Sequence, residues 1–429
     1  MHIPRTMFII VLLSFCLNSF SQSFTKNLVI KSGKPEAGGM SPARLAKIDA
    51  YLQSNVDSGF VNGMAALIIR NGVVVYNKAF GYNDEKQKAR MQPDNIFRIA
   101  SQSKAITSVA VLMLYEEGKF LLDDDLSKYI PEFKNPVVLA KFNAADTTYT
   151  TVPASREIKI RDLLTHTSGI GYAQIGSKEA NAIYAKAGVT SGIGVGKIKL
   201  ADGMKRLGSC PLFHNPGEKF TYGLNTDLLG YLVEVVSGMS LNDFLQTRLF
   251  TPLGMKDTYF FLPTSKKDRL VPLYTEDKEL HKAVLMKPTI QIQETFIRDY
   301  PLTDGTYYSG GGGLSSTMMD YAIFLQMLMN GGEYNGVRIL GRNTVRMMLM
   351  NQTASIGNSF GLGFGLTTEE NKGKLPVQEG AFEWGGMFAT GYWADPKEKL
   401  IGLIYRNIWP TTHGDNALFK VLTYSAIND

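Results

Sequence analysis

Strand-forming sequences lie near the two ends of this 429-residue chain, and a long stretch with helical patterns separates them. Near the start, the apolar runs 64–69 and 73–76 flank Asn71-Gly72, the residue pair favoured where a tight hairpin needs positive φ at both turn positions. Near the end, strand patterns return at 381–384, 388–393 and 400–406. We therefore predict an α/β fold in which one α/β unit is split by a helical insertion.

Helical patterns define the rest of the chain. Ser41-Pro42 is a good N-cap and first-turn pair, so a helix is predicted to follow it. Apart from short pieces, strand signals are absent between the hairpin and Phe360. We place the α/β subdomain at about 41–105 and 330–429, and the mainly helical insertion at about 106–329. Further helices are predicted at 106–117, 160–164, 226–237, 241–249, 319–329 and from about 416.

Composition narrows the classes of function. Hydrophobic residues make up 44% of the chain and charged residues 20%, as in ordinary globular proteins. The net charge of +6 is spread along the chain without a run of five like charges, so no nucleic-acid partner is expected. With Cys16 and Cys210 as the two cysteines, and five histidines without zinc-ligand spacing, neither a metal nor another cofactor is expected. The run 194–197 lacks the glycine and hydroxyl residues of a phosphate loop.

The first 21 residues have the pattern of an export signal. A basic start with Arg5 precedes an apolar run from Met7 to Leu17, and Ser19 and Ser21 follow at a plausible cleavage site. The run is shorter than the roughly 20 apolar residues that a spanning helix needs. We therefore expect an exported protein, periplasmic or secreted, that contacts a membrane only if this segment is retained or if Cys16 is lipidated.

Ser101-Gln-Ser-Lys104 places a hydroxyl and an amine three residues apart at the start of the helical run 105–114. On a helix these two side chains share a face. Lysine can then accept the serine proton if desolvation or nearby cations lower its pKa, and backbone N–H groups at the helix start can stabilise an oxyanion. The tetrapeptide alone favours a helix cap with a solvated lysine over a catalytic pair, and residues 23–26 match it too.

Four blocks occur in order between about residues 41 and 427: Phe97-Arg-Ile-Ala-Ser-Gln-Ser-Lys104, Ile160-Arg-Asp-Leu-Leu-Thr-His-Thr-Ser-Gly169, Pro216-Gly-Glu-Lys-Phe-Thr-Tyr222 and Gly311-Gly-Gly-Leu-Ser-Ser-Thr317. Together they closely resemble the serine β-lactamase and penicillin-recognising family, above all class C β-lactamases and family VIII carboxylesterases. The resemblance implies an antiparallel sheet flanked by helices and an acyl-serine mechanism. It also implies that Ser101 is the nucleophile, with Lys104 and Tyr222 as its proton-handling partners.

The third family block, normally Lys-Thr-Gly or His-x-Gly on an edge strand, maps onto Trp384-Gly385-Gly386, which the resemblance makes substrate-binding. The backbone N–H groups of Ser101 and Met387 then match the two oxyanion donors. The family asparagine of the Tyr-x-Asn block is displaced by one place, to Asn225. Its contact with substrate is therefore open.

Trp384 replaces the cation that normally helps to hold a β-lactam carboxylate, so esters are favoured over β-lactams as substrates. We predict a serine hydrolase that acts on a small-molecule ester or amide and is favoured as a carboxylesterase. A β-lactamase, a D-Ala-D-Ala carboxypeptidase and a non-catalytic cell-wall or ligand-binding module remain the alternatives.

Two further sets of residues compete for a catalytic role. Gly357-Asn-Ser359-Phe-Gly361 matches the nucleophile elbow of α/β-hydrolases, with Asp395 and His413 in the permitted order. The glycine-rich sequence that follows Ser359 does not have the helix that an elbow requires. His166 could act as a general base, but its block is typical of a structural loop after a helix.

Overall fold

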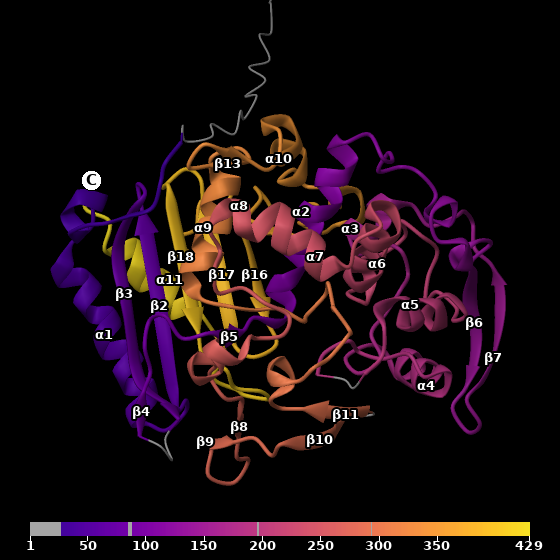
Figure 1. Ribbon diagram of the computed structural model, residues 1–429, viewed down its shortest axis with the longest axis horizontal. Helices are drawn as coiled ribbons and strands as arrows, with labels where there is room; N and C mark the ends of the chain where they lie inside the picture. The colour runs from indigo at the N-terminus through magenta and orange to yellow at the C-terminus, as the bar shows by residue number, and fades with distance from the viewer. Residues whose placement is uncertain (1–26, 85–87, 195–196, 293) are drawn as a thin grey trace, which may run out of the picture.

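The computed structural model describes residues 27–84, 88–194, 197–292 and 294–429, and a large sheet forms its centre (Figure 1). Both ends of the chain contribute strands, in the order β1-β3-β2-β18-β17-β16-β15, with β4 paired to β3. Neighbouring strands are antiparallel, except that β1 is parallel to β3. The predicted α/β class is confirmed. The strands are β1 (Lys31–Ser32), β2 (Gly63–Arg70), β3 (Val73–Asp84), β4 (Ala89–Arg90), β15 (Gly365–Leu366), β16 (Phe382–Gly386), β17 (Thr390–Asp395) and β18 (Leu400–Tyr405).

The predicted hairpin is the turn between β2 and β3. Asn71 and Gly72 adopt φ values of 53° and 73°, the positive values that a tight hairpin turn requires. Strand β2 is buried throughout, because successive side chains enter two different cores. Leu67 packs into the core on one face of the sheet, and Ile68 packs into the core on the other.

Helices cover both faces of the sheet (Figure 1). Helices α1 (Pro42–Asp57) and α11 (Ala417–Ser425) pack on one face, and α2 (Ser103–Glu116) and α9 (Met318–Met329) pack on the other. Ser41 caps α1 by accepting a hydrogen bond of 3.4 Å from the Arg44 N–H, as its sequence predicts. Ser101, which directly precedes α2, therefore lies between a buried helix and the sheet.

The chain between the N-terminal and the C-terminal strands of the large sheet contains helices and several hairpins. The strand signal there was weak because β7 is exposed along its whole length, and an exposed strand lacks the alternation that marks a half-buried one. The helix predicted at 241–249 is α-helical only as far as Leu245, and a π-helical turn over Gln246–Phe250 follows it. The domain boundaries near 105 and 330 stay a prediction. The elements are β5 (Phe97–Arg98), β6 (Val137–Asn143), β7 (Thr148–Pro153), α3 (Ile160–Leu164), α4 (Lys178–Ala187), α5 (Leu200–Gly208), α6 (Asn225–Ser237), α7 (Leu241–Leu245), α8 (Thr251–Leu253), β8 (Tyr274–Glu276), β9 (Ala283–Leu285), β10 (Thr289–Ile292), β11 (Glu294–Ile297), β12 (Ser315–Ser316), β13 (Glu333–Tyr334), β14 (Val337–Arg338) and α10 (Arg342–Met348).

The predicted export segment, residues 1–21, lies outside the described residues. Within the part of the chain that the structure describes, no single helix has the length and apolar composition of a membrane span. The bent pair of helical segments 225–237 and 241–253 meets those two criteria together.

Candidate active site

Ser101 lies at the partly exposed start of an otherwise buried helix. Strand β5 pairs with β12 just before it, and a 3₁₀ turn over Ala100–Gln102 leads directly into α2. Ala100 has a φ of 43°, a left-handed conformation that costs a non-glycine residue about 1–3 kcal/mol. Such strain persists only where packing enforces it, and here Ala100 is completely buried. The surrounding structure therefore holds the Ser101 backbone in one position.

Lys104 is the centre of a buried hydrogen-bond network. Its side chain is almost inaccessible to solvent, with 2% of the residue exposed. Its Nζ lies 3.2 Å from Ser101 Oγ, 2.9 Å from Tyr172 Oη and 2.6 Å from the Gly311 carbonyl oxygen. It also lies 4.7 Å from the centre of the Tyr222 ring. The structure thus brings together Ser101, Lys104 and Tyr222, which the sequence analysis singled out.

Tyr172 and the Gly311 carbonyl belong to this network but were missed from sequence. Tyr172 is 68 residues from Lys104 in the chain and has no motif of its own. Its one signal is its place three residues after Gly169, at the end of the second family block. Gly311 lies in the four-glycine run, and a Cβ there would sit 2.3 Å from Asp227 Oδ2. This run of four glycines, residues 310–313, therefore allows a close approach of backbone to Asp227.

The network keeps Lys104 protonated. Burial lowers the pKa of Lys104, but the negative charge that Tyr172 and Tyr222 can carry, together with their hydrogen bonds, raises it more, so the pKa lies above its ordinary value. Burial raises the pKa of Tyr172, and the Lys104 charge opposes that rise. The condition from the sequence analysis, a lysine pKa lowered by desolvation or by cations, is therefore not met. At neutral pH, Lys104 is therefore an ammonium group in the resting site.

Tyr222 is held between a histidine and a tryptophan. The His166 ring centre lies 4.9 Å from that of Tyr222, and Trp384 Nε1 donates a hydrogen bond of 3.4 Å to Tyr222 Oη. His166 is buried, and burial and the Lys104 charge hold its pKa well below the ordinary value. A neutral histidine beneath the Tyr222 ring fits the structural loop that the sequence analysis favoured for His166.

Asn225 does not face the nucleophile. Its side chain is fully buried, accepts a hydrogen bond from Ser168 Oγ and lies 3.0 Å from His166 Nδ1. The amide therefore joins the first turn of α6 to the loop around His166. The polar atoms of the Asn225 side chain thus have partners inside the protein, and its contact with substrate stays a prediction.

The end of strand β16 forms the opposite wall of the site. Strand β15 pairs only with Phe382 and Glu383 of β16. Strand β16 therefore continues beyond the end of β15, towards Ser101. A Cβ on Gly386 would lie 2.3 Å from the Ile99 carbonyl oxygen, so only glycine lets this strand approach the nucleophile loop so closely. At Gly385 the nearest atom to such a Cβ is 3.4 Å away, which leaves that side of the strand open.

A cavity of about 450 Å³ lies between the helical wall, formed by Ser101, Tyr172 and Tyr222, and the strand wall, formed by Trp384, Gly385 and Met387. Of the described residues that line it, none carries a charge, and four are aromatic. Such a lining suits an uncharged, partly apolar group. The lining residues are Ser101, Tyr172, Gln174, Ile175, Ile193, Tyr222, Trp384, Gly385, Met387 and Trp409.

The α/β-hydrolase alternative does not assemble. Ser359 Oγ lies 3.0 Å from Thr368 Oγ1, Asp395 accepts hydrogen bonds from Tyr424 and nearby backbone N–H groups, and His413 stacks on Phe60. Each of these residues has partners of its own. Among the described residues, no group of three or more His, Cys, Asp and Glu side chains is placed to hold a metal ion.

Comparisons with known proteins agree with this fold and site. The Beta-lactamase family model matches residues 48–424, and the chain therefore belongs to the beta-lactamase family. Members of this family are serine hydrolases, esterases and acyltransferases among them, and the chain is an enzyme of this class. The predicted family resemblance is confirmed.

Relatives match along most of their own length. Protein Rv1367c of Mycobacterium tuberculosis is 31% identical over 374 residues, which cover 83% of this chain and 88% of the relative. Esterase EstB of Burkholderia gladioli is 27% identical over 383 residues, 87% of this chain and 93% of that protein. Among solved structures, EstCE1, described as a hydrolase with promiscuous acyltransferase activity, superposes with a TM-score of 0.75 at 25% identity, covering 90% of this chain and 99% of EstCE1.

Proposed function

We propose that this protein is a carboxylesterase that hydrolyses small, uncharged esters through an acyl-enzyme on Ser101. The observation that carries this proposal is the uncharged, aromatic cavity over Ser101, which is lined by Trp384 where the family resemblance implies a substrate-binding cation. An indole offers an apolar wall and one N–H donor, so it cannot attract a carboxylate as an ammonium does. The names of EstB and EstCE1 support the same class of activity.

In the first half of the reaction, Ser101 Oγ forms a bond with the ester carbonyl carbon, and its proton passes to the network of Lys104, Tyr172 and Tyr222. Because Lys104 is held as an ammonium, we assign proton acceptance to Tyr222 as a phenolate that this ammonium stabilises. The carbonyl oxygen becomes an oxyanion, which accepts hydrogen bonds from the backbone N–H groups of Ser101 and Met387. The C–O bond to the alcohol then breaks, and the alcohol oxygen receives the proton from Tyr222.

In the second half, a water molecule attacks the acyl carbon and gives its proton to the same network. The bond between Ser101 Oγ and the acyl group breaks, the acid leaves, and Ser101 regains its proton. Both halves use one proton-handling unit, because the acid of the first step becomes the base of the next.

A side-by-side rate measurement tests the assignment. The purified protein is assayed on a short-chain aryl ester, a chromogenic cephalosporin and a D-Ala-D-Ala peptide. We expect kcat/KM on the ester to exceed the other two by at least about tenfold, the value of one charge-assisted hydrogen bond. An equal or higher value on the cephalosporin or the peptide would move the protein to the β-lactamase or carboxypeptidase alternative. Failure of a fluorophosphonate probe to label Ser101 would favour a non-catalytic module.

We also propose that residues 1–21 direct export and that the mature enzyme is periplasmic or secreted. The basic start, short apolar run and small residues at 19 and 21 support this. N-terminal sequencing of the protein recovered from the periplasm or medium should start after residue 21. Recovery of the full chain in the cytoplasm would contradict the proposal.

A further inference from the structure

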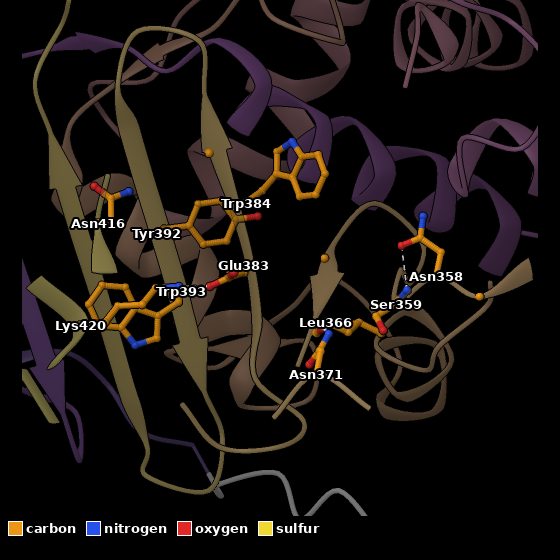
Figure 2. A pocket seen from close by; sticks show the side chains of 13 residues that line it. Asn358, Ser359, Leu366, Asn371, Glu383, Trp384, Tyr392, Trp393, Asn416 and Lys420 are labelled. Atoms are coloured by element: carbon orange, nitrogen blue, oxygen red, sulfur yellow. Dashed lines mark hydrogen bonds and ion pairs between the residues drawn. The ribbon is translucent and has the colours of Figure 1, made fainter. Parts of the chain in front are cut away.

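A second cavity, of about 420 Å³, is lined by Trp384 and by residues of β15, β16, β17 and α11 (Figure 2). It shares Trp384 and Gly385 with the cavity over Ser101, so the two cavities meet at the end of strand β16. The second cavity is polar, with amide and hydroxyl groups in its lining. Its other lining residues are Gly357, Asn358, Ser359, Gly365, Leu366, Asn371, Glu383, Tyr392, Trp393, Asn416 and Lys420.

The second cavity contains one ion pair, between Lys420 of α11 and Glu383 of β16. Lys420 is the one cation among the described residues that line either cavity. Its side chain is 11% exposed, and its Nζ lies 5.6 Å from the centre of the Trp393 ring, whereas the Glu383 side chain is 41% exposed. Lys420 is therefore poorly hydrated and depends on Glu383 for its counter-charge.

Glu383 directly precedes Trp384, and neighbouring residues of a strand point to opposite faces. Figure 2 shows Trp384 on one side of the strand and Glu383 on the other, towards Trp393 and Lys420. A substrate carboxylate that enters this cavity must either displace Glu383 from Lys420 or lie beside its negative charge. Both alternatives are unfavourable, because the first breaks the existing ion pair between Glu383 and Lys420 and the second places two like charges side by side.

We propose that Glu383 is a specificity-determining residue: by pairing with Lys420, it neutralises the cavity that adjoins the Ser101 site and excludes esters that carry a carboxylate. This inference rests on the proposed esterase function and names the substrate class as neutral esters. Trp384 stands where the family resemblance implies a cation that binds a carboxylate, and Glu383 pairs with Lys420, the one cation among the described residues that line the two cavities.

Two matched pairs of esters test the role of Glu383. One pair differs on the acyl side, 4-nitrophenyl hemisuccinate against 4-nitrophenyl butyrate. The other differs on the alcohol side, 4-acetoxybenzoate against its methyl ester. Glu383→Gln should raise the ratio of kcat/KM for the charged over the neutral ester about tenfold in at least one pair, since Lys420 is then free to bind a carboxylate.

Further variants separate this role from a purely structural one. Glu383→Gln/Lys420→Met should return the ratio to the wild-type value, and Lys420→Met alone should lower it, because Glu383 then keeps an uncompensated charge. Glu369→Gln removes the same charge from the exposed pair with Lys372, outside both cavities, and should leave the ratio unchanged. Thermal melting of each variant shows whether it is folded.

If Glu383→Gln unfolds, the lowered ratio expected of Lys420→Met decides the question by itself. An unchanged ratio for both ester pairs in a folded Glu383→Gln variant, or an equal shift in Glu369→Gln, overturns the inference and leaves the pair as a link between α11 and β16. A wild-type protein that hydrolyses neither neutral ester overturns the esterase proposal instead.

Discussion

The two walls of the Ser101 site differ in burial and in the number of contacts that hold them. On the helical wall, Lys104 and Tyr172 are buried and joined by a direct hydrogen bond, and the Gly311 carbonyl holds the same ammonium. On the strand wall, Trp384 and Met387 are partly exposed at the end of a strand. The chemistry therefore depends on a preorganised interior, whereas recognition depends on side chains that can change at little cost to folding.

Ser101→Ala should have the largest effect, because the helical wall holds no second hydroxyl beside Lys104 in the motif. The nearby Ser103 is buried, and its Oγ accepts a hydrogen bond of 3.1 Å from the Leu314 N–H. We expect esterase activity to fall by on the order of a thousandfold or more. Intact-mass measurement after incubation with a reactive ester should show an acyl adduct on the wild type alone; an equal yield on the alanine variant would place the nucleophile elsewhere.

Lys104→Ala and Tyr222→Phe should each lower kcat/KM by on the order of several hundredfold, and the double variant should lose far less than the product of the two. The reason is that both side chains serve one proton transfer. If the losses in kcat/KM of the two single variants multiply in the double variant, Lys104 and Tyr222 act independently and do not form a single proton-handling unit.

The pH dependence of the wild-type reaction tests the same unit. Because Lys104 is held as an ammonium, the network must lose one proton before it can accept that of Ser101, so log kcat/KM on a neutral ester should rise with pH between about 6 and 9, with a slope near one. The measurement needs correction for spontaneous ester hydrolysis. A flat profile over this range would indicate a base that is already deprotonated, in conflict with the raised pKa.

Trp384→Lys should act on the strand wall and shift substrate preference. A lysine can form a charge-assisted hydrogen bond with a carboxylate, which contributes about 1.5 to 3 kcal/mol, or roughly ten- to a hundredfold. We expect the ratio of ester to cephalosporin kcat/KM to fall by about that factor, through lost esterase activity and some gain on the cephalosporin. Melting temperatures must accompany the kinetics. An unchanged ratio in a folded variant would make Trp384 a packing residue only.

The smallest effect concerns stability behind the helical wall. Asp227 is buried near Lys104 and Gly311, and burial raises its pKa to about 6. The folded state therefore favours the protonated form, and this contribution is complete below about pH 4 and lost as the pH rises to about 6. A rise of about two pKa units corresponds to roughly 3 kcal/mol.

Urea unfolding of Asp227→Asn and of the wild type across pH 4 to 7 tests this prediction. The stability of the variant relative to the wild type should increase from pH 4 to pH 6, because asparagine does not titrate. The comparison cancels other acids that the two proteins share, such as Asp320, whose pKa burial also raises to about 6. A constant difference would mean that the pKa of Asp227 is not raised by folding.

The structure brings together several residues that local sequence signals singled out for this site. Ser101 and Lys104 lie one turn apart because helical spacing alone places them so, and Gly386 marks a close approach of backbone. Asn225 shows where such reasoning stops. A shift of one residue at the start of α6 changes the direction of its side chain by a large fraction of a turn, and only the packing around His166 decides where it ends.

The sequence by itself determined the hairpin at Asn71-Gly72, the helix capped by Ser41, and the family to which the chain belongs, because these depend on neighbouring residues or on the order of motifs along the chain. Tertiary structure alone decided that Tyr172 contacts Lys104, that the lysine pKa rises, and that Glu383 pairs with Lys420. The physical reason is that hydrogen bonding, desolvation and charge pairing depend on distances between segments far apart in the chain, and only folding sets those distances.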